Sequence, residues 1–155
     1  MKLSKKQLFA ICEIVLGVLA LVLLFAPALH YEGLLVEYDW SGYEVFFGTV
    51  DWFDASAGGI ITFILLLVIV CAGVLKFFMP KQMKIFNFII IVCGVLAGIF
   101  LFMGCTDFMA NIAGDDVKFS DVKDYYDLGA GAIVSAIFAL CAAAVACLDE
   151  FFVKK

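Results

Sequence analysis

Four long apolar runs constrain what this chain can fold into more than any other feature of its sequence. They cover residues 8–29, 58–79, 85–105 and 128–148, and each is 21 or 22 residues long. About 20 apolar residues in a helix cross the hydrocarbon core of a bilayer. Because 66% of the 155 residues are hydrophobic, a soluble domain is excluded. The sequence predicts an all-α integral membrane protein in which residues 1–155 form one domain with a four-helix transmembrane bundle.

The first run has features of a cleaved signal peptide. Lys2, Lys5 and Lys6 give it a basic start, and Ala26-Pro27-Ala28 imitates a cleavage site. However, the apolar stretch is longer than the roughly 7–15 residues of a signal core. We therefore expect a retained signal-anchor helix.

The lysines predict the orientation of the chain. All ten basic residues are lysine, and eight of them lie near the two ends of the chain or around the turn at Pro80. Only Lys118 and Lys123 lie in the loops 30–57 and 106–127. Positive residues favour the cytoplasmic side. We expect a multi-pass protein of the plasma (cytoplasmic) membrane with both termini in the cytoplasm and these two loops outside.

Acidic residues show the opposite bias, since twelve of the fifteen lie in the two outer loops. They either keep the loops soluble or form a negative funnel that concentrates cations at a pore. The second loop carries a cluster of five: Asp115, Asp116, Asp121, Asp124 and Asp127. These carboxylates could bind Ca²⁺, or they could lie at the N-terminal end of the last helix, where negative charge is favourable. Their spacing matches no calcium-binding loop. The net charge of −5 argues against nucleic-acid binding.

Few residues are candidates for catalysis, for metal binding or for proton or ion binding. Glu13 is the one ionisable residue well within a run, and two interpretations stay open: pairing with Lys6, Lys76 or Lys84, or an ion or proton role. His30 with Glu32 is either a pH-sensitive pair or an interfacial anchor. One histidine and six scattered cysteines do not make a metal site, and no phosphate cradle or nucleophile elbow is present. We predict no enzyme activity, no metal and no cofactor.

Small residues predict where helices touch, because they let backbones approach closely. The last run places them at intervals of four, and the third contains a glycine pair: Gly131, Ser135, Ala139 and Ala143, and Gly94 and Gly98. We expect the last helix to be central. These faces serve either the bundle itself or a partner, which would be a second copy or another membrane protein. Gly17-Val18-Leu19-Ala20 recurs as Gly94-Val95-Leu96-Ala97, which suggests two similar halves.

The first outer loop predicts a small β-hairpin. Residues 34–38 and 43–48 are β-prone and flank a turn at 39–42, and residues 117–119 could add a strand. All tryptophans and tyrosines lie on this side, where such rings settle at the headgroups. We expect an interaction surface made of Trp40, Tyr43, Phe46, Phe47 and Trp52.

This order of elements resembles the claudin and peripheral-myelin-protein superfamily in topology. Trp40-Ser41-Gly42-Tyr43 lies where that family carries its tryptophan-rich signature, although the family's paired loop cysteines are missing. The whole chain also resembles small four-span membrane proteins of bacteria, whose first loop often reads Ser-Gly-aromatic and then Phe-Gly, as in Ser41-Gly42-Tyr43 and Phe47-Gly48. These resemblances imply a topology and no activity.

We therefore expect a non-catalytic membrane scaffold or accessory subunit, surrounded by lipid, that binds partners through its outer loops and small-residue helix faces. The alternative is an oligomeric channel or transporter-like pore with an acidic outer vestibule for cations. A pore needs a polar stripe through the bilayer, and the runs offer little beyond Glu13, Thr62, Asn87 and Ser135.

Overall fold

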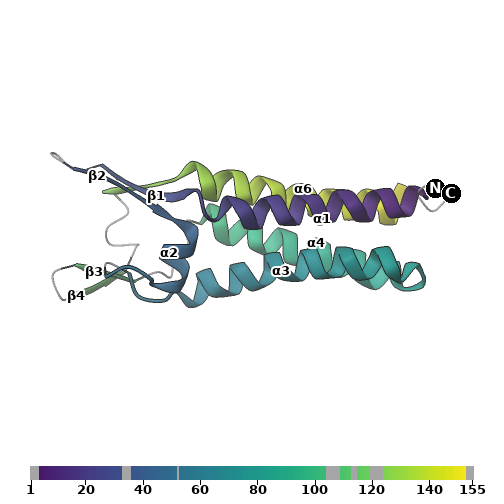
Figure 1. Ribbon diagram of the computed structural model, residues 1–155, viewed down its shortest axis with the longest axis horizontal. Helices are drawn as coiled ribbons and strands as arrows, with labels where there is room; N and C mark the ends of the chain where they lie inside the picture. The colour runs from purple at the N-terminus through teal and green to yellow at the C-terminus, as the bar shows by residue number, and fades with distance from the viewer. Residues whose placement is uncertain are drawn as a thin grey trace.

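Four long helices run side by side through most of the molecule (Figure 1). The computed structural model describes residues 4–32, 36–51, 53–103, 109–112, 115–118 and 124–152. The long helices are α1 (Lys5–Leu23), α3 (Ala57–Phe78), α4 (Met83–Phe102) and α6 (Ala130–Phe152). Within the described residues, these four are long and apolar enough to cross a membrane. The predicted four-helix arrangement is confirmed.

The four helices form a closed ring. α1 packs against α3 and α6, and α4 packs against the same two helices. Every helix in the ring thus has two principal neighbours. The last helix, α6, has neighbours on two sides, as predicted, but so does each of the other three, so α6 is not more central than they are.

The helix ends differ from the predicted ones at two places. α3 and α4 begin and end within three residues of the predicted limits, but α1 stops at Leu23 instead of continuing to residue 29. Pro27 opens a strand there, because proline lacks a backbone N–H and disfavours helix at the preceding residue. α6 continues past the predicted end at residue 148 to Phe152, which brings Asp149 and Glu150 into the helix.

A three-stranded antiparallel sheet lies beyond one end of the bundle. Its order is β2 (Glu37–Ser41), β1 (Pro27–Glu32) and β5 (Tyr126–Leu128). β1 and β2 form a hairpin, so a small β element in this region is confirmed, but the predicted pairing is wrong, because β1 lies before the predicted first strand and the predicted turn at residues 39–42 falls mostly in β2. The segment 115–118 does not add the third strand. It forms β4 (Asp115–Lys118), which pairs with β3 (Met109–Ile112) in a separate sheet; Phe119 lies outside the described residues.

The predicted second strand at residues 43–48 is instead a short helix, α2 (Gly42–Phe47). The Ser41 hydroxyl accepts a hydrogen bond from the Glu44 backbone N–H, and the Glu44 carboxylate accepts one from the Ser41 N–H. This reciprocal capping box starts a helix. Gly48 ends it in the left-handed region with φ of 59°, where glycine carries no steric penalty.

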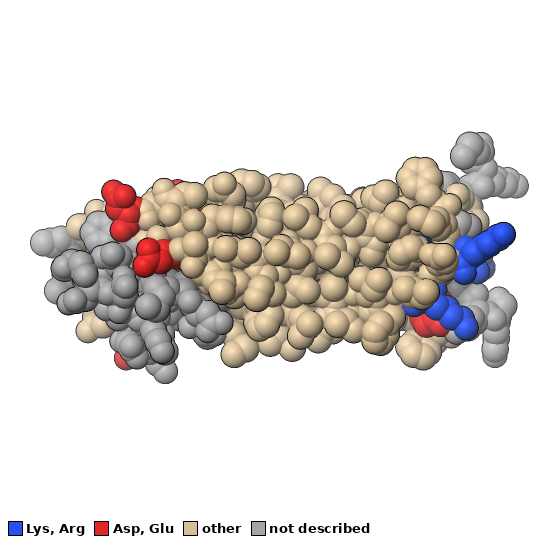
Figure 2. Space-filling model, turned by 90° about the horizontal axis from the view of Figure 1, so that it is seen from below, with Lys and Arg blue, Asp and Glu red and all other residues tan. Residues whose placement is uncertain are grey.

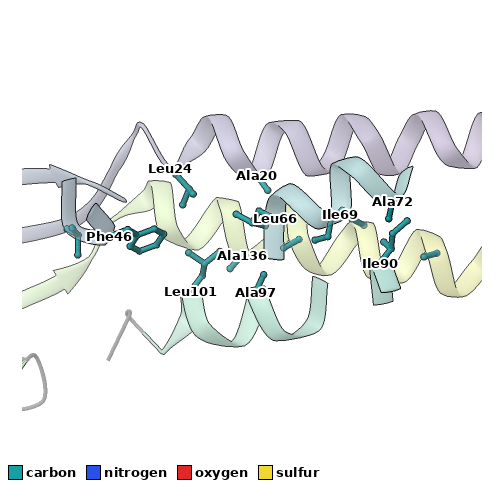
Figure 3. Packing of buried hydrophobic residues seen from close by; sticks show 14 of the residues in the cluster. Ala20, Leu24, Phe46, Leu66, Ile69, Ala72, Ile90, Ala97, Leu101 and Ala136 are labelled. Carbon is teal, nitrogen blue, oxygen red and sulfur yellow. The ribbon is translucent and has the colours of Figure 1, made fainter. Parts of the chain in front are cut away.

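The interior of the bundle is filled by side chains from all four long helices (Figure 3). Small side chains alternate with larger ones at the contacts, so the backbones come close together. The fully buried residues of this core include Ala20, Leu66, Ile69, Ile90, Ala97, Leu101 and Ala136. Phe46 of α2 closes the sheet end, where its ring lies against Gly59 of α3.

The repeated Gly-Val-Leu-Ala segments make equivalent contacts in the two halves. A Cβ added at Gly17 of α1 would meet Val70 of α3 at 2.9 Å. A Cβ added at Gly94 of α4 would meet the backbone oxygen of Ala139 in α6 at 2.6 Å. In each half the glycine therefore lets the first helix approach the second.

Candidate functional site

Charged side chains gather at opposite ends of the molecule and leave an uncharged band between them (Figure 2). We name the two ends by what they carry. The lysine end, where α1 begins and α6 ends, exposes Lys5, Lys6, Lys81 and Lys84. The sheet end exposes acidic residues, and the band between is covered by side chains such as Ile64 and Val92.

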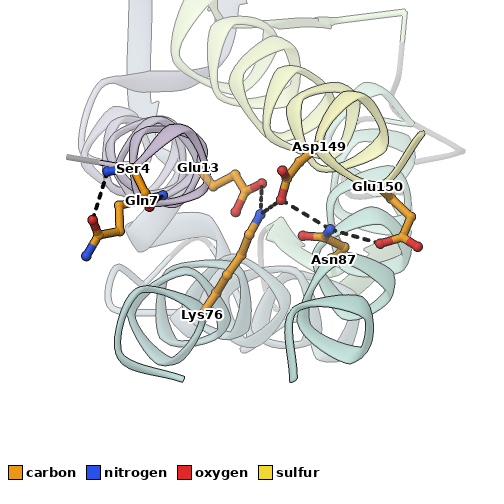
Figure 4. A network of polar contacts seen from close by, with 7 residues as sticks. All are labelled: Ser4, Gln7, Glu13, Lys76, Asn87, Asp149 and Glu150. Carbon is orange, nitrogen blue, oxygen red and sulfur yellow. Dashed lines mark hydrogen bonds and ion pairs between the residues drawn. The ribbon is translucent and has the colours of Figure 1, made fainter. Parts of the chain in front are cut away.

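A buried polar cluster ties the four long helices together near the lysine end (Figure 4). Lys76 Nζ of α3 lies 2.6 Å from Glu13 Oε1 of α1 and 2.8 Å from Asp149 Oδ2 of α6. Asn87 Nδ2 of α4 donates to Asp149 Oδ2 at 3.3 Å. We call Glu13, Lys76, Asn87 and Asp149 the four-helix cluster.

The four-helix cluster is shielded from the surroundings. The side chains of Glu13 and Lys76 are 0% exposed and that of Asp149 is 2% exposed. Asn87 also donates to Glu150 Oε2 at 3.3 Å, and Glu150 is half-buried at the rim. Two buried carboxylates thus share one buried ammonium group.

Two oxygen atoms of the four-helix cluster have no hydrogen-bond partner among the described residues. They are Glu13 Oε2 and Asn87 Oδ1, and both are buried. Buried polar atoms are normally paired, because burial without a partner costs free energy. The cluster is therefore an exception that calls for a chemical explanation.

The sequence identified only part of this cluster. The sequence singled out Glu13 alone, whereas Lys76 and Asp149, which lie near the ends of their helices, are buried beside it. Of the three lysines proposed as partners, Lys76 pairs with Glu13, whereas Lys6 and Lys84 are exposed. A helical stripe could have revealed the other members. Lys76 continues the buried series Leu66, Ile69 and Gly73, and Asp149 continues Ala139, Ala142 and Ala146, at intervals of three and four.

The small residues predicted to mark helix contacts all lie inside the bundle. Gly94 faces Ala139 and Ala143, and Gly98 faces Leu140 of the same helix, α6. Ser135 donates a hydrogen bond of 2.7 Å to the backbone oxygen of Ala20. Gly131 lies against the backbone oxygens of residues 26 and 27, at the corner between α1 and β1. In this structure the bundle itself therefore occupies these faces, and their use by a partner stays a prediction.

The sheet sorts its side chains onto two faces, as alternation along a strand requires. One face is aromatic and carries Tyr31, Tyr38, Trp40 and Tyr126. The Tyr31 and Tyr126 ring centroids are 5.1 Å apart, and Trp40 meets the Phe53 ring edge-on at the same distance. We call this the aromatic face; Trp40 is half-buried in it.

The predicted interaction surface is only partly exposed. Phe46 is 1% exposed, so it belongs to the core and cannot contact a partner. Tyr43 is 40% exposed and stacks on Phe25, while half-buried Phe47 packs against Phe63. Trp52 lies outside the described residues. Tyr43 is thus the most accessible described member of the predicted set.

The opposite face of the sheet is acidic. It carries His30 together with exposed carboxylates, which are Glu32, Glu37, Asp39 and Asp127. We call this set the acidic face. His30 Nδ1 lies 2.6 Å from Asp39 Oδ1, and this hydrogen bond is the main cause of a pKa for His30 above its usual value of 6.5. The predicted partner Glu32 contributes only at longer range.

The predicted acidic cluster of the second outer loop is divided between elements. Asp115 and Asp116 belong to β4, whereas Asp127 belongs to β5 in the other sheet, and Asp124 is exposed just before it. Asp121 lies outside the described residues. In the part of the chain that the structure describes, no group of three or more metal-ligating side chains is present.

Comparison with known proteins gives no relative: no protein-family model, curated protein or solved structure matches this chain. The topological resemblance to claudins and to small bacterial membrane proteins therefore stays a prediction.

Proposed function

We propose that this chain is a multi-pass protein of the plasma (cytoplasmic) membrane, with the lysine end in the cytoplasm and the sheet end outside. The four apolar helices and the uncharged band on the face shown in Figure 2 support insertion. The exposed lysines support the orientation, because positively charged residues are retained on the cytoplasmic side.

We further propose that the protein is a non-catalytic accessory subunit that binds a partner protein at the sheet end. The observation that carries this proposal is the sorting of the sheet into two faces. The aromatic face packs against another aromatic side chain of the same chain, since Trp40 contacts Phe53. The carboxylates of the acidic face are exposed. Complementary charge steers association and selects partners. The expected partner therefore presents a basic extracytoplasmic surface.

The filled interior argues against a pore through a single bundle. Leu66, Ile90 and Leu101 are fully buried along its length. The buried ion pairs of the described residues lie at the lysine end, and the described core between the two ends is mainly apolar. Conduction would then require a ring of several copies.

Insertion and orientation are tested by cysteine accessibility in intact cells. The described native cysteines all lie in the four long helices, so a new cysteine in a loop is distinguishable. We expect a membrane-impermeant maleimide to label Glu37→Cys in intact cells and Lys81→Cys only after the cells are opened. The reverse pattern would overturn the proposed orientation.

Partner binding is tested by a photoreactive amino acid at position 32 or 37 of the acidic face, in cells that make the chain naturally. We expect an adduct with one protein, which is lost when Asp39→Lys inverts the local charge and kept in Lys84→Glu at the opposite end. A probe at Phe88, which is 69% exposed on α4, should give lipid adducts as a control. Equal adducts from all positions, or ion conductance from the purified protein in liposomes, would contradict the accessory role.

A further inference from the structure

We propose that the four-helix cluster is a proton-binding site in which Glu13 carries one proton on Oε2 at neutral pH. This inference is independent of partner binding at the sheet end. It rests on the charges, the burial and the unpaired oxygens of the cluster.

The charges of the cluster do not balance without a proton. Glu13 and Asp149 would each contribute a negative charge, against the single positive charge of Lys76. A net charge buried away from water is strongly unfavourable. One added proton makes the cluster neutral. Glu150 at its rim is only half-buried, so its charge is not enclosed with the others.

Hydrogen bonding indicates which carboxylate takes the proton. Asp149 Oδ2 forms an ion pair with Lys76 Nζ at 2.8 Å and accepts a hydrogen bond from Asn87, so two groups stabilise its negative charge. Glu13 accepts only from Lys76, through Oε1, and its Oε2 is buried with no partner. Protonation of Oε2 removes charge from the one carboxylate oxygen that nothing stabilises.

The proton is exchanged with water in a simple balanced step. A hydronium ion transfers its proton to Glu13 Oε2, an O–H bond forms, and a neutral water molecule is left. Among the described residues, Lys76 of α3 contacts this carboxyl directly, and the same ammonium group pairs with Asp149 of α6. Asn87 of α4 links Asp149 to Glu150 at the rim of the cluster. The cluster lies close to the lysine end, so it responds to the pH on that side.

A proton fits this site better than a metal cation. The ammonium of Lys76 already lies between the two carboxylates, at 2.6 and 2.8 Å, and would repel a second cation. Hard cations also require several oxygen ligands at once. Only two oxygens of the cluster are recorded as buried without a partner.

Infrared spectroscopy of the full chain in lipid nanodiscs tests the proposal. We expect the carbonyl band of a protonated carboxylic acid at neutral pH, shifted in heavy water. Glu13→Gln should remove it, and so should Asp149→Asn, because loss of either negative charge leaves Lys76 balanced without a proton. Asp124→Asn, at an exposed position, should keep the band. Absence of the band in the unmodified chain, or its survival in both cluster variants, would overturn the proposal.

Thermal unfolding gives a second readout. If the folded chain holds one proton that the unfolded chain releases, the unfolding constant rises by about tenfold per pH unit above the usual carboxyl range. Asp149→Asn should flatten this slope even if Glu13→Gln fails to fold. A slope unchanged in Asp149→Asn would contradict a shared proton. A higher unfolding temperature in sodium salt than in choline salt at equal ionic strength, together with no carboxylic-acid band, would show a cation site instead.

Discussion

Glu13 and Lys76 are 63 positions apart in the sequence, yet Oε1 and Nζ lie 2.6 Å apart between two fully buried side chains. The contact fixes how far α1 and α3 slide past each other, because any shift would separate the pair. Asp149 extends the same restraint to α6. A buried polar contact of this kind is weak evidence of stability but can specify register, and here we assign it that role.

Lys76→Met should destabilise the fold by about 3–5 kcal/mol, because it leaves the buried Asp149 carboxylate without its cation and Glu13 without its hydrogen-bond donor. The free energy of unfolding in detergent micelles is the appropriate measurement. Lys84→Met is the matched control, since Lys84 is exposed at the same end, and it should change stability by no more than about 0.5 kcal/mol. Equal effects of the two variants would show that Lys76 is hydrated and not part of a buried pair.

Ala143→Leu should destabilise the bundle by about 1–3 kcal/mol, because a larger side chain overpacks the contact between α4 and α6. The Ala143 Cβ lies 3.0 Å from the position that a Cβ on Gly94 would take. Ala144→Leu, one position along and exposed, should remain within about 0.5 kcal/mol of the parent chain. Melting temperatures compared in one detergent distinguish the two. The ring arrangement would be in doubt if Ala144→Leu proved the more harmful change.

Ser41→Ala should weaken α2 by about 1 kcal/mol, because the hydroxyl that accepts from the Glu44 N–H is removed. Hydrogen exchange of the backbone amides of α2 should become faster, while exchange within α4 stays the same. Glu44→Gln is the control, because glutamine can also accept from the Ser41 N–H in a capping box. Unchanged protection in Ser41→Ala would mean that packing of Phe46 alone holds α2 in place.

The four helices were predictable because each depends on a local property. An apolar run of sufficient length reports a spanning helix whatever its neighbours are. The end of α1 was missed because the apolar run continues past the point where Pro27 opens a strand. The capping pair Ser41 and Glu44 was visible in the sequence, but the β-prone residues around it favoured a strand.

The four-helix cluster was harder to predict because its members meet only in the tertiary structure. A lysine near the end of a span normally extends its ammonium group toward water. Lys76 instead turns inward, because Glu13 and Asp149 from two other helices surround its ammonium group. The position of β5 beside β1 likewise depends on a contact between residues about a hundred positions apart, which no local pattern encodes.

His30 should titrate above its usual value, because its hydrogen bond with Asp39 raises the pKa of the imidazole. His30 is the one histidine of the chain, so its ring signal in an NMR titration is unambiguous. Asp39→Asn should lower this pKa toward about 6.5, whereas Asp127→Asn should leave it nearly unchanged. Because the folded pKa is the higher one, the pair contributes stability that is complete below the unfolded value of about 6.5. That contribution is lost as pH rises through the folded pKa. A titration midpoint insensitive to Asp39→Asn would contradict the pairing seen between β1 and β2.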